Sequence, residues 1–94
     1  MELIDVRVQE SDFDVGAELG RLRANDAGVG AVGSFVGVVR DLNDGAEVAT
    51  MHLEHYPGMT ERSIETIVRE AATRWALCGA IVVHRVGKLK PCDQ

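Results

Sequence analysis

Arg40 is the residue of this chain best placed to bind an anion, because it lies at the end of the first of two apolar runs that are predicted to pair. Residues 32–39 and 48–53 are the two apolar runs, and the polar connection between them contains Asp44-Gly45. This pair suits the positive φ angles of a reversing turn, so the pattern predicts an antiparallel hairpin. Arg40 ends the first strand, where a side chain is held at its base and its tip can reach a ligand. Its guanidinium offers paired donors to a phosphate and stays charged at any relevant pH.

An ordinary surface ion pair is the alternative for Arg40, since Asp41 and Asp44 lie near it in the sequence. Spacing alone does not separate the two interpretations, because exposed arginines beside acidic residues are common. Val38 and Val39 belong to the same segment and would contribute backbone contacts more than side-chain chemistry.

The histidines do not form a metal site by their spacing. His52 and His55 are three positions apart, so on a strand their side chains point to opposite faces and cannot share one ion. His55 falls on the face of Met51 and Leu53, which predicts a partly buried, hydrogen-bonded histidine, with a role in a ligand pocket as the alternative. The same structural interpretation applies to His84 in the last apolar run.

Residues 28–33 match the pattern GxGxxG, and Glu54 follows about twenty residues later, as in a dinucleotide fingerprint. That motif must follow a strand and open a helix whose N-terminus holds the pyrophosphate. Here it is preceded by a helical pattern and runs into the β-branched residues 32–39. The glycines are therefore interpreted as a flexible turn and a close-packing position.

Size and charge restrict the class of protein. The 94 residues predict one domain, residues 1–94, with 46% hydrophobic and 27% charged residues, typical of a globular protein. The net charge of -5 provides no basic surface for nucleic acid. No apolar stretch has the length of a signal peptide core or a membrane span, so we expect a cytoplasmic protein without a membrane partner. Cys78 and Cys92 have no metal-binding or disulfide pattern and are interpreted as ordinary thiols.

The apolar periodicity predicts the element order β, α, β, β, α, β. Strands are expected at residues 2–8, 32–39, 48–53 and 81–86, and helices are expected to begin at Ser11 and Thr60, whose hydroxyls can cap them. The first helix should end near Asn25 and Gly28. This order indicates an α+β fold in which two helices cover one face of a mainly antiparallel sheet.

The sequence FVGVVRD, followed at residues 53–61 by LEHYPGMTE and later by VVHRVGKLKP, closely resembles the large, catalytic subunit family of molybdopterin synthases. The resemblance spans nearly the whole chain and implies an α/β-hammerhead-like fold. Family members continue past the turn written here as Pro91-Cys92-Asp93, whereas this sequence ends at Gln94, so the C-terminal part of the family fold is missing. Residues 81–86 are therefore expected to lack a neighbouring strand, and the isolated chain to be marginally folded or prone to aggregation.

The resemblance also implies a function. Family members convert cyclic pyranopterin monophosphate, or precursor Z, into molybdopterin by adding two sulfur atoms, without a metal or organic cofactor. The sulfur arrives as a C-terminal thiocarboxylate after Gly-Gly on a small ubiquitin-like carrier subunit, and two large subunits form the centre of a heterotetramer. Arg40 corresponds to an arginine that contacts the pterin, with Val38 and Val39 beside it. A role of Cys92 as the sulfur donor is disfavoured, because the family motif has no cysteine there.

The main catalytic residues of the family, a His-Arg pair and lysines on and after a final helix, match no position of these 94 residues. Lys88 and Lys90 precede the turn and do not correspond to those lysines. A lysine near the substrate can act as a base or a nucleophile, and without it the chemical step lacks the residue that transfers the proton. The resemblance therefore predicts an enzyme family but an inactive polypeptide. The alternative is a catalytically inactive truncated remnant that only binds or dimerises.

Overall fold

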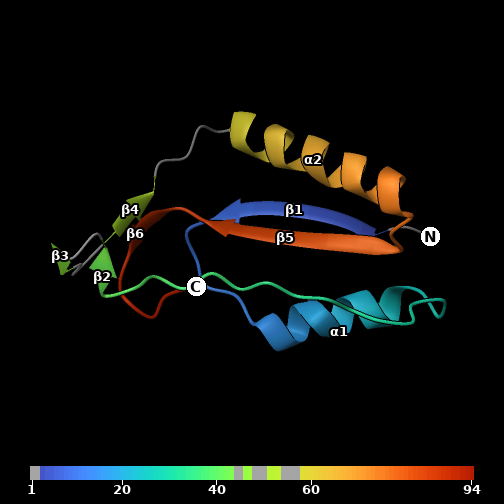
Figure 1. Cartoon of the computed structure of the whole chain (residues 1–94), viewed down its shortest axis with the longest axis horizontal. Coiled ribbons are helices and arrows are strands. Elements are labelled where there is room, and N and C mark those ends of the chain that lie inside the picture. The colour runs from blue at the N-terminus through green and yellow to red at the C-terminus, as the bar shows by residue number, and fades with distance from the viewer. Residues whose placement is uncertain (1–2, 44–45, 48–50, 54–57) are drawn as a thin grey trace.

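The structure is a computed structural model, and it describes residues 3–43, 46–47, 51–53 and 58–94 (Figure 1). Two helices and short β-sheets make up this part of the chain, so the predicted α+β class is confirmed. The elements in chain order are β1 (Leu3–Gln9), α1 (Val15–Asn25), β2 (Leu42–Asn43), β3 (Ala46–Glu47), β4 (Met51–Leu53), α2 (Met59–Trp75), β5 (Gly79–Arg85) and β6 (Gly87–Leu89).

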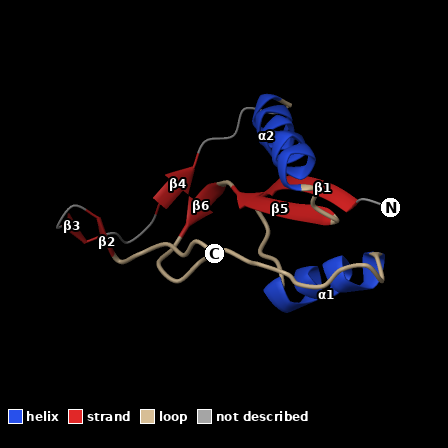
Figure 2. Cartoon of the chain, turned by 45° about the vertical axis from the view of Figure 1, so that its right-hand side comes forward, coloured by secondary structure: helices blue, strands red, loops and turns tan. Residues whose placement is uncertain are grey.

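The two longest strands, β1 and β5, form a parallel pair that runs from Leu3 beside Gly79 to Gln9 beside Arg85. Helix α2 lies on one side of this pair and α1 on the other (Figures 1 and 2). The prediction of two helices on one face was therefore wrong, and the main strand pair is parallel. A crossover connection with a helix permits parallel strands, but the direction of pairing leaves no signal in the local periodicity. Strand β5 also has a neighbour, contrary to the expectation for residues 81–86.

Two shorter antiparallel pairs involve the middle of the chain. Strands β2 and β3 pair on either side of residues 44–45, which lie outside the described residues, and β4 pairs with β6. The predicted hairpin between residues 32–39 and 48–53 is therefore wrong in its partners. Residues 32–39 form no strand, residues 48–50 lie outside the described part, and β4 pairs with a strand close to the C-terminus.

Both helices begin a few residues away from their predicted caps. Asp14 caps α1, and its Oδ1 accepts a hydrogen bond of 3.0 Å from the N–H of Ala17, so Ser11 does not begin the helix. Helix α2 begins after Gly58, whose N–H donates to the Glu61 carboxylate at 3.4 Å, and Thr60 lies inside the first turn. Ser11 and Asp14 near the first start, and Gly58 and Thr60 near the second, are all residue types that can cap a helix, so the sequence left the caps ambiguous. Neither described helix is long and apolar enough to cross a membrane.

The buried core of the described residues is small. It consists of Val68 and Ala72 on α2 together with Val86, between β5 and β6, and Leu89 of β6. Helix α1 contributes no buried residue. The radius of gyration is 15.1 Å, compared with about 12 Å for a compact domain of this length. The molecule is therefore more open than its length alone would require.

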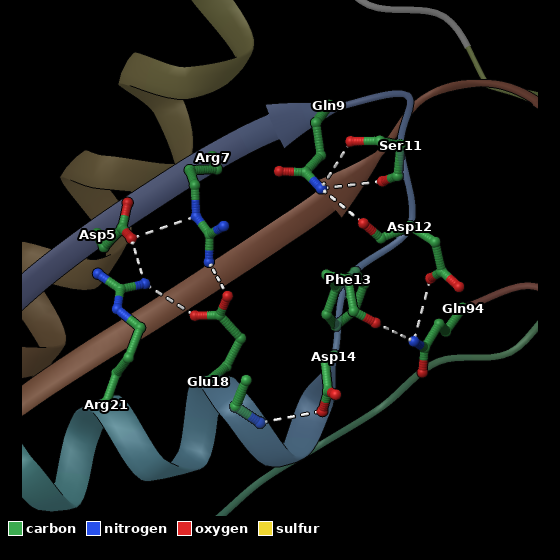
Figure 3. Close-up of polar contacts among 11 residues, drawn as sticks. Asp5, Arg7, Gln9, Ser11, Asp12, Phe13, Asp14, Glu18, Arg21 and Gln94 are labelled. Atoms are coloured by element: carbon green, nitrogen blue, oxygen red, sulfur yellow. Dashed lines mark hydrogen bonds and ion pairs between the residues drawn. The ribbon is translucent and has the colours of Figure 1, made fainter.

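Four charged side chains join β1 to α1 (Figure 3). Arg7 of β1 lies 2.6 Å from a Glu18 carboxylate oxygen and 3.2 Å from that of Asp5. Arg21 of α1 lies 2.9 Å from Asp5 and 2.8 Å from Glu18. The hydrogen bond from Arg7, followed by that from Arg21, holds the pKa of Glu18 below its ordinary value of 4.5. This network joins α1, which has no fully buried residue, to β1.

We expect the stability of a Glu18→Gln variant to fall less with decreasing pH, below about pH 4.5, than that of the wild type. Because the folded-state pKa of Glu18 is lowered, its contribution to the free energy of unfolding is complete above the unfolded pKa of 4.5 and is lost as the pH falls through the lowered value. Thermal melts from pH 7 to pH 2 should show a steeper fall of Tm below pH 4.5 in the wild type. A Glu70→Gln variant on the exposed side of α2 controls for net charge, and equal slopes for wild type and Glu18→Gln would contradict the prediction.

Candidate functional site

The segment that carries Arg40 is anchored to the C-terminal turn by the backbone of Val39. The Val39 N–H donates to the carbonyl oxygen of Asp93 at 2.8 Å, and the N–H of Cys92 donates to the carbonyl oxygen of Val39 at 2.9 Å. These bonds join residues more than fifty positions apart in the sequence. The residue before Arg40 is thus held at both of its backbone polar groups.

Two hydrogen bonds between Lys90 and Asp93 close the anchoring turn. The Asp93 N–H donates to the Lys90 carbonyl oxygen at 3.0 Å, and the Asp93 carboxylate accepts from the Lys90 N–H at 2.8 Å. Cys92 has a φ of 77°, directly after Pro91. Proline followed by a residue with positive φ is the pattern of a type II turn. Two residues, Cys92 and Asp93, face the single residue Val39, as in a β-bulge whose first residue is left-handed.

Arg85, at the end of β5, fastens this turn to the rest of the molecule. Its side chain is only 12% exposed and lies 3.9 Å from the carboxylates of both Asp12 and Asp93. It donates to the Glu10 carbonyl oxygen at 2.9 and 3.1 Å and to the Gln94 carbonyl oxygen at 3.4 Å. The turn therefore has little freedom to move relative to the sheet.

Gln94 provides a second connection, to the segment that leads into α1. Its Nε2 donates to the Phe13 carbonyl oxygen at 2.6 Å and to the Asp12 carboxylate at 3.1 Å (Figure 3). The backbone N–H of Phe13, followed by the Gln94 amide, lowers the pKa of Asp12 from its ordinary value of 3.8. The C-terminal turn is thus tied to β5, to the start of α1 and to Val39.

The residues of the predicted binding segment differ in their exposure beside this anchored backbone. Val39 is partly buried, Val38 is 55% exposed and Arg40 is exposed. The structure therefore places Arg40 on a fixed base with its guanidinium accessible to solvent. That arrangement suits a cation that receives an anionic ligand, because the backbone needs no ordering when the ligand binds.

The remaining predicted candidates are not gathered around Arg40 in the described part. His55 and Glu54 lie outside the described residues, and His52 is placed only by the pairing of its backbone with Lys88. His84 is partly buried in β5, opposite Val8, and its Nδ1 makes no hydrogen bond to the described residues. The GxGxxG residues 28–33 follow α1 and open no helix, which agrees with their interpretation as a turn.

Sequence reasoning missed Arg85 and Gln94, the two residues that hold the turn in place. Arg85 follows the last apolar run without any motif of its own, and Gln94 has no motif around it. Their importance comes from contacts to Glu10, Asp12 and Phe13, more than seventy residues earlier. No local pattern in the sequence carries that information.

We expect a Cys92→Gly substitution to stabilise the protein by about 1 kcal/mol, because a side chain at positive φ costs about 1–2 kcal/mol and glycine removes that strain. The midpoint of urea denaturation, at constant m value, is the measurement. Cys78→Gly is the matched control, since Cys78 is also exposed and has no positive φ. A loss of stability in Cys92→Gly, or an equal gain in the control, would contradict the proposed strain.

Known proteins of similar sequence and structure now identify the family. The MoaE protein family matches residues 8–94. The molybdopterin synthase catalytic subunit of Ralstonia nicotianae is 60% identical over 89 residues, which cover 95% of this chain and 51% of that protein. The corresponding subunit of Pseudomonas aeruginosa is 54% identical over 86 residues, covering 92% and 57%.

A solved structure of a molybdopterin biosynthesis MoaE protein from Burkholderia ambifaria matches with a TM-score of 0.87 and 50% identity, over 98% of this chain and 59% of that one. The chain thus spans between about half and three fifths of the length of these relatives. The resemblance predicted from FVGVVRD and LEHYPGMTE is confirmed, and this chain belongs to the MoaE protein family.

Proposed function

We propose that this chain is the substrate-holding portion of a molybdopterin synthase catalytic subunit, acting in molybdenum cofactor biosynthesis. The observation that carries the proposal is the family match over residues 8–94, together with relatives that are named molybdopterin synthase catalytic subunits. The substrate would be cyclic pyranopterin monophosphate, which is converted to molybdopterin by the addition of two sulfur atoms. The phosphate of this substrate supplies the negative charge that an exposed arginine can recognise.

Arg40 would hold the phosphorylated pterin, with the backbone of Val38 and Val39 beside it. Support comes from the two backbone hydrogen bonds of Val39 and from the exposure of Arg40. A guanidinium on a fixed backbone can orient a substrate for attack, and such positioning can contribute several kcal/mol to lowering a reaction barrier. His55 stays a predicted pocket residue, because it lies outside the described part of the chain.

The sulfur donor would be a small ubiquitin-like subunit with a thiocarboxylate after its terminal Gly-Gly. Two copies of the catalytic subunit would form the centre of a heterotetramer with two such carriers. The description of the relatives as catalytic subunits supports a partner subunit. A cytoplasmic location remains a prediction from the sequence.

We expect the 94-residue chain to bind cyclic pyranopterin monophosphate saturably but not to convert it. Binding requires the Arg40 segment, which is present, whereas the family's lysines and His-Arg pair match no position of this sequence. Isothermal titration of the chain with the pterin tests the first part. The absence of saturable binding up to millimolar pterin would overturn the proposed function.

Conversion is tested by adding the thiocarboxylated carrier and assaying for molybdopterin, with the Ralstonia nicotianae catalytic subunit in place of the chain as the positive control. Binding without conversion supports a substrate-holding portion, which is also what a non-catalytic remnant would show. Molybdopterin formed by the 94-residue chain above the level of a protein-free control would show that its own residues complete the chemistry.

A further inference from the structure

The segment that carries Arg40 is attached to the rest of the molecule at one residue. Residues 30–40 form no helix or strand, and the only backbone hydrogen bonds that they make to described residues are the two of Val39. A backbone that is free to move loses conformational entropy when a ligand fixes it. The position of Arg40 before a ligand arrives therefore depends on what holds Cys92 and Asp93, the two partners of Val39.

Arg85 is more deeply buried than the arginines that join β1 to α1. Its side chain is 12% exposed, compared with 33% for Arg7 and 44% for Arg21. Burying a guanidinium costs solvation free energy, and a buried ion pair is often no more stabilising than an apolar side chain of the same volume. The carboxylates nearest to Arg85, those of Asp12 and Asp93, lie 3.9 Å away, beyond hydrogen-bonding distance. Stability alone therefore gives little reason for an arginine at this position.

The Arg85 guanidinium instead fixes the spacing between three segments of the chain, which meet beside the C-terminal turn (Figure 1). Its Nε and Nη2 both donate to the carbonyl oxygen of Glu10, at 3.1 and 2.9 Å. Its Nη1 faces the carboxylates of Asp12 and Asp93. A planar group with several donors in a rigid fork can make these contacts together, whereas a lysine ammonium is a single point charge. Arg85 thus sets where the turn lies relative to β5 and to residues 10–12.

The segment that receives the Arg85 donors is itself held against the sheet. The N–H of Val86 donates to the carbonyl oxygen of Gln9 at 3.0 Å. The side chain of Glu10 lies against Gly87, where a Cβ atom would be only 3.0 Å from the Glu10 Oε1. Gly87 has a φ of 84°, which favours glycine there. Arg85 therefore connects the turn to a fixed base.

We propose that Arg85 is a positioning residue for the Arg40 guanidinium and thereby raises the affinity for the pterin. It acts through Asp93, whose carbonyl oxygen accepts the Val39 N–H at 2.8 Å, one residue before Arg40. Without Arg85 the turn moves independently of the sheet, so the ligand itself must order the Arg40 segment. This inference rests on the proposed function, in which Arg40 binds the phosphate of the substrate.

Amide hydrogen exchange tests the first step without a pterin. Arg85→Met replaces the guanidinium by an apolar side chain, and we expect the N–H groups of Val39 and Cys92 to exchange on the order of tenfold faster, relative to the amides of α2. Arg7→Met is the matched control. Arg7 lies on the same face of the sheet, two residues along β1 from the partner of Arg85, and belongs to the network with α1. Its loss should leave this ratio unchanged.

Isothermal titration with cyclic pyranopterin monophosphate tests the second step. Arg85→Met should weaken binding on the order of tenfold in the wild type, but by less than about twofold in an Arg40→Ala background. A merely structural role would weaken binding alike in both backgrounds. Arg85→Lys, which retains the charge but not the fork, should recover only part of the affinity and of the exchange protection.

Three results would overturn the proposal. Equal relative exchange at Val39 in wild type and Arg85→Met would show that Arg85 does not hold the segment, whether or not the chain binds a pterin. An equal loss of affinity in both backgrounds would show that the effect does not pass through Arg40. If Arg85→Met does not fold, Arg85→Lys carries both measurements, and wild-type exchange and affinity in that variant would show that the fork is not needed. Absence of pterin binding by the wild type would instead overturn the proposed function, and the exchange measurement would still decide whether Arg85 holds the segment.

Discussion

An Arg40→Ala variant should bind cyclic pyranopterin monophosphate about 10 to 100 times more weakly than the wild type. Loss of a charge-assisted, two-donor contact to phosphate removes about 1.5–3 kcal/mol of binding free energy. The fold should be nearly unaffected, because Arg40 is exposed and the anchoring of its segment uses only the backbone of Val39. Isothermal titration gives the affinity, and a thermal melt of the same sample checks the fold.

Two further variants separate specific recognition from general charge. Arg40→Lys retains the positive charge but not the planar fork, so its affinity should fall between those of wild type and Arg40→Ala. Arg69→Ala removes another exposed cation, one on α2 that pairs with Glu65 at 2.9 Å, and should leave affinity unchanged. If Arg40→Ala and Arg69→Ala bind the pterin equally well, Arg40 is not the anion-binding residue.

A Leu89→Ala variant should lose about 2–4 kcal/mol of stability, a large share of the total for a domain of this size. Leu89 is only 3% exposed and is one of four buried hydrophobic residues among those described. Its truncation leaves a cavity, and the few side chains of so small a core cannot rearrange to fill it. Because β6 leads directly into the turn that anchors Val39, pterin affinity should fall as well. Urea denaturation followed by circular dichroism measures the loss.

Phe35→Ala is the matched control for this experiment. Phe35 is larger than Leu89 but 95% exposed, so its truncation removes little buried area and should change stability by less than about 0.5 kcal/mol. A comparable loss of stability in both variants would show that Phe35 is buried in solution and would contradict its exposed position. An unchanged midpoint for Leu89→Ala would instead contradict the position of the core.

Local patterns were sufficient to locate both helices. Val15, Leu19 and Leu22 recur at helical spacing, and α1 ends at Asn25 as predicted; the periodic residues from Ile64 to Trp75 lie within α2. These signals are reliable because the hydrogen bonds of a helix close within four residues. The exact starts were missed because Asp14 and Gly58 lie within a few positions of other suitable caps.

The pairing partners of the strands could not be predicted from the same local patterns. Residues 32–39 have the β-branched composition of a strand, and they form none in the described structure. A strand exists only through hydrogen bonds to another segment, and composition does not name that segment. For the same reason the parallel direction of β1 and β5, and the pairing of β4 with β6, could not be predicted from alternation.

The amino-acid sequence by itself determined the family, the α+β class and the identity of Arg40 as the candidate anion-binding residue, because each rests on residue types and their spacing along the chain. Tertiary structure alone decided how that arginine is supported. Val39 is held by Cys92 and Asp93, and their turn is held by Arg85. These contacts join segments that are distant in the sequence, so their energies depend on the folded arrangement and leave no local pattern to predict them.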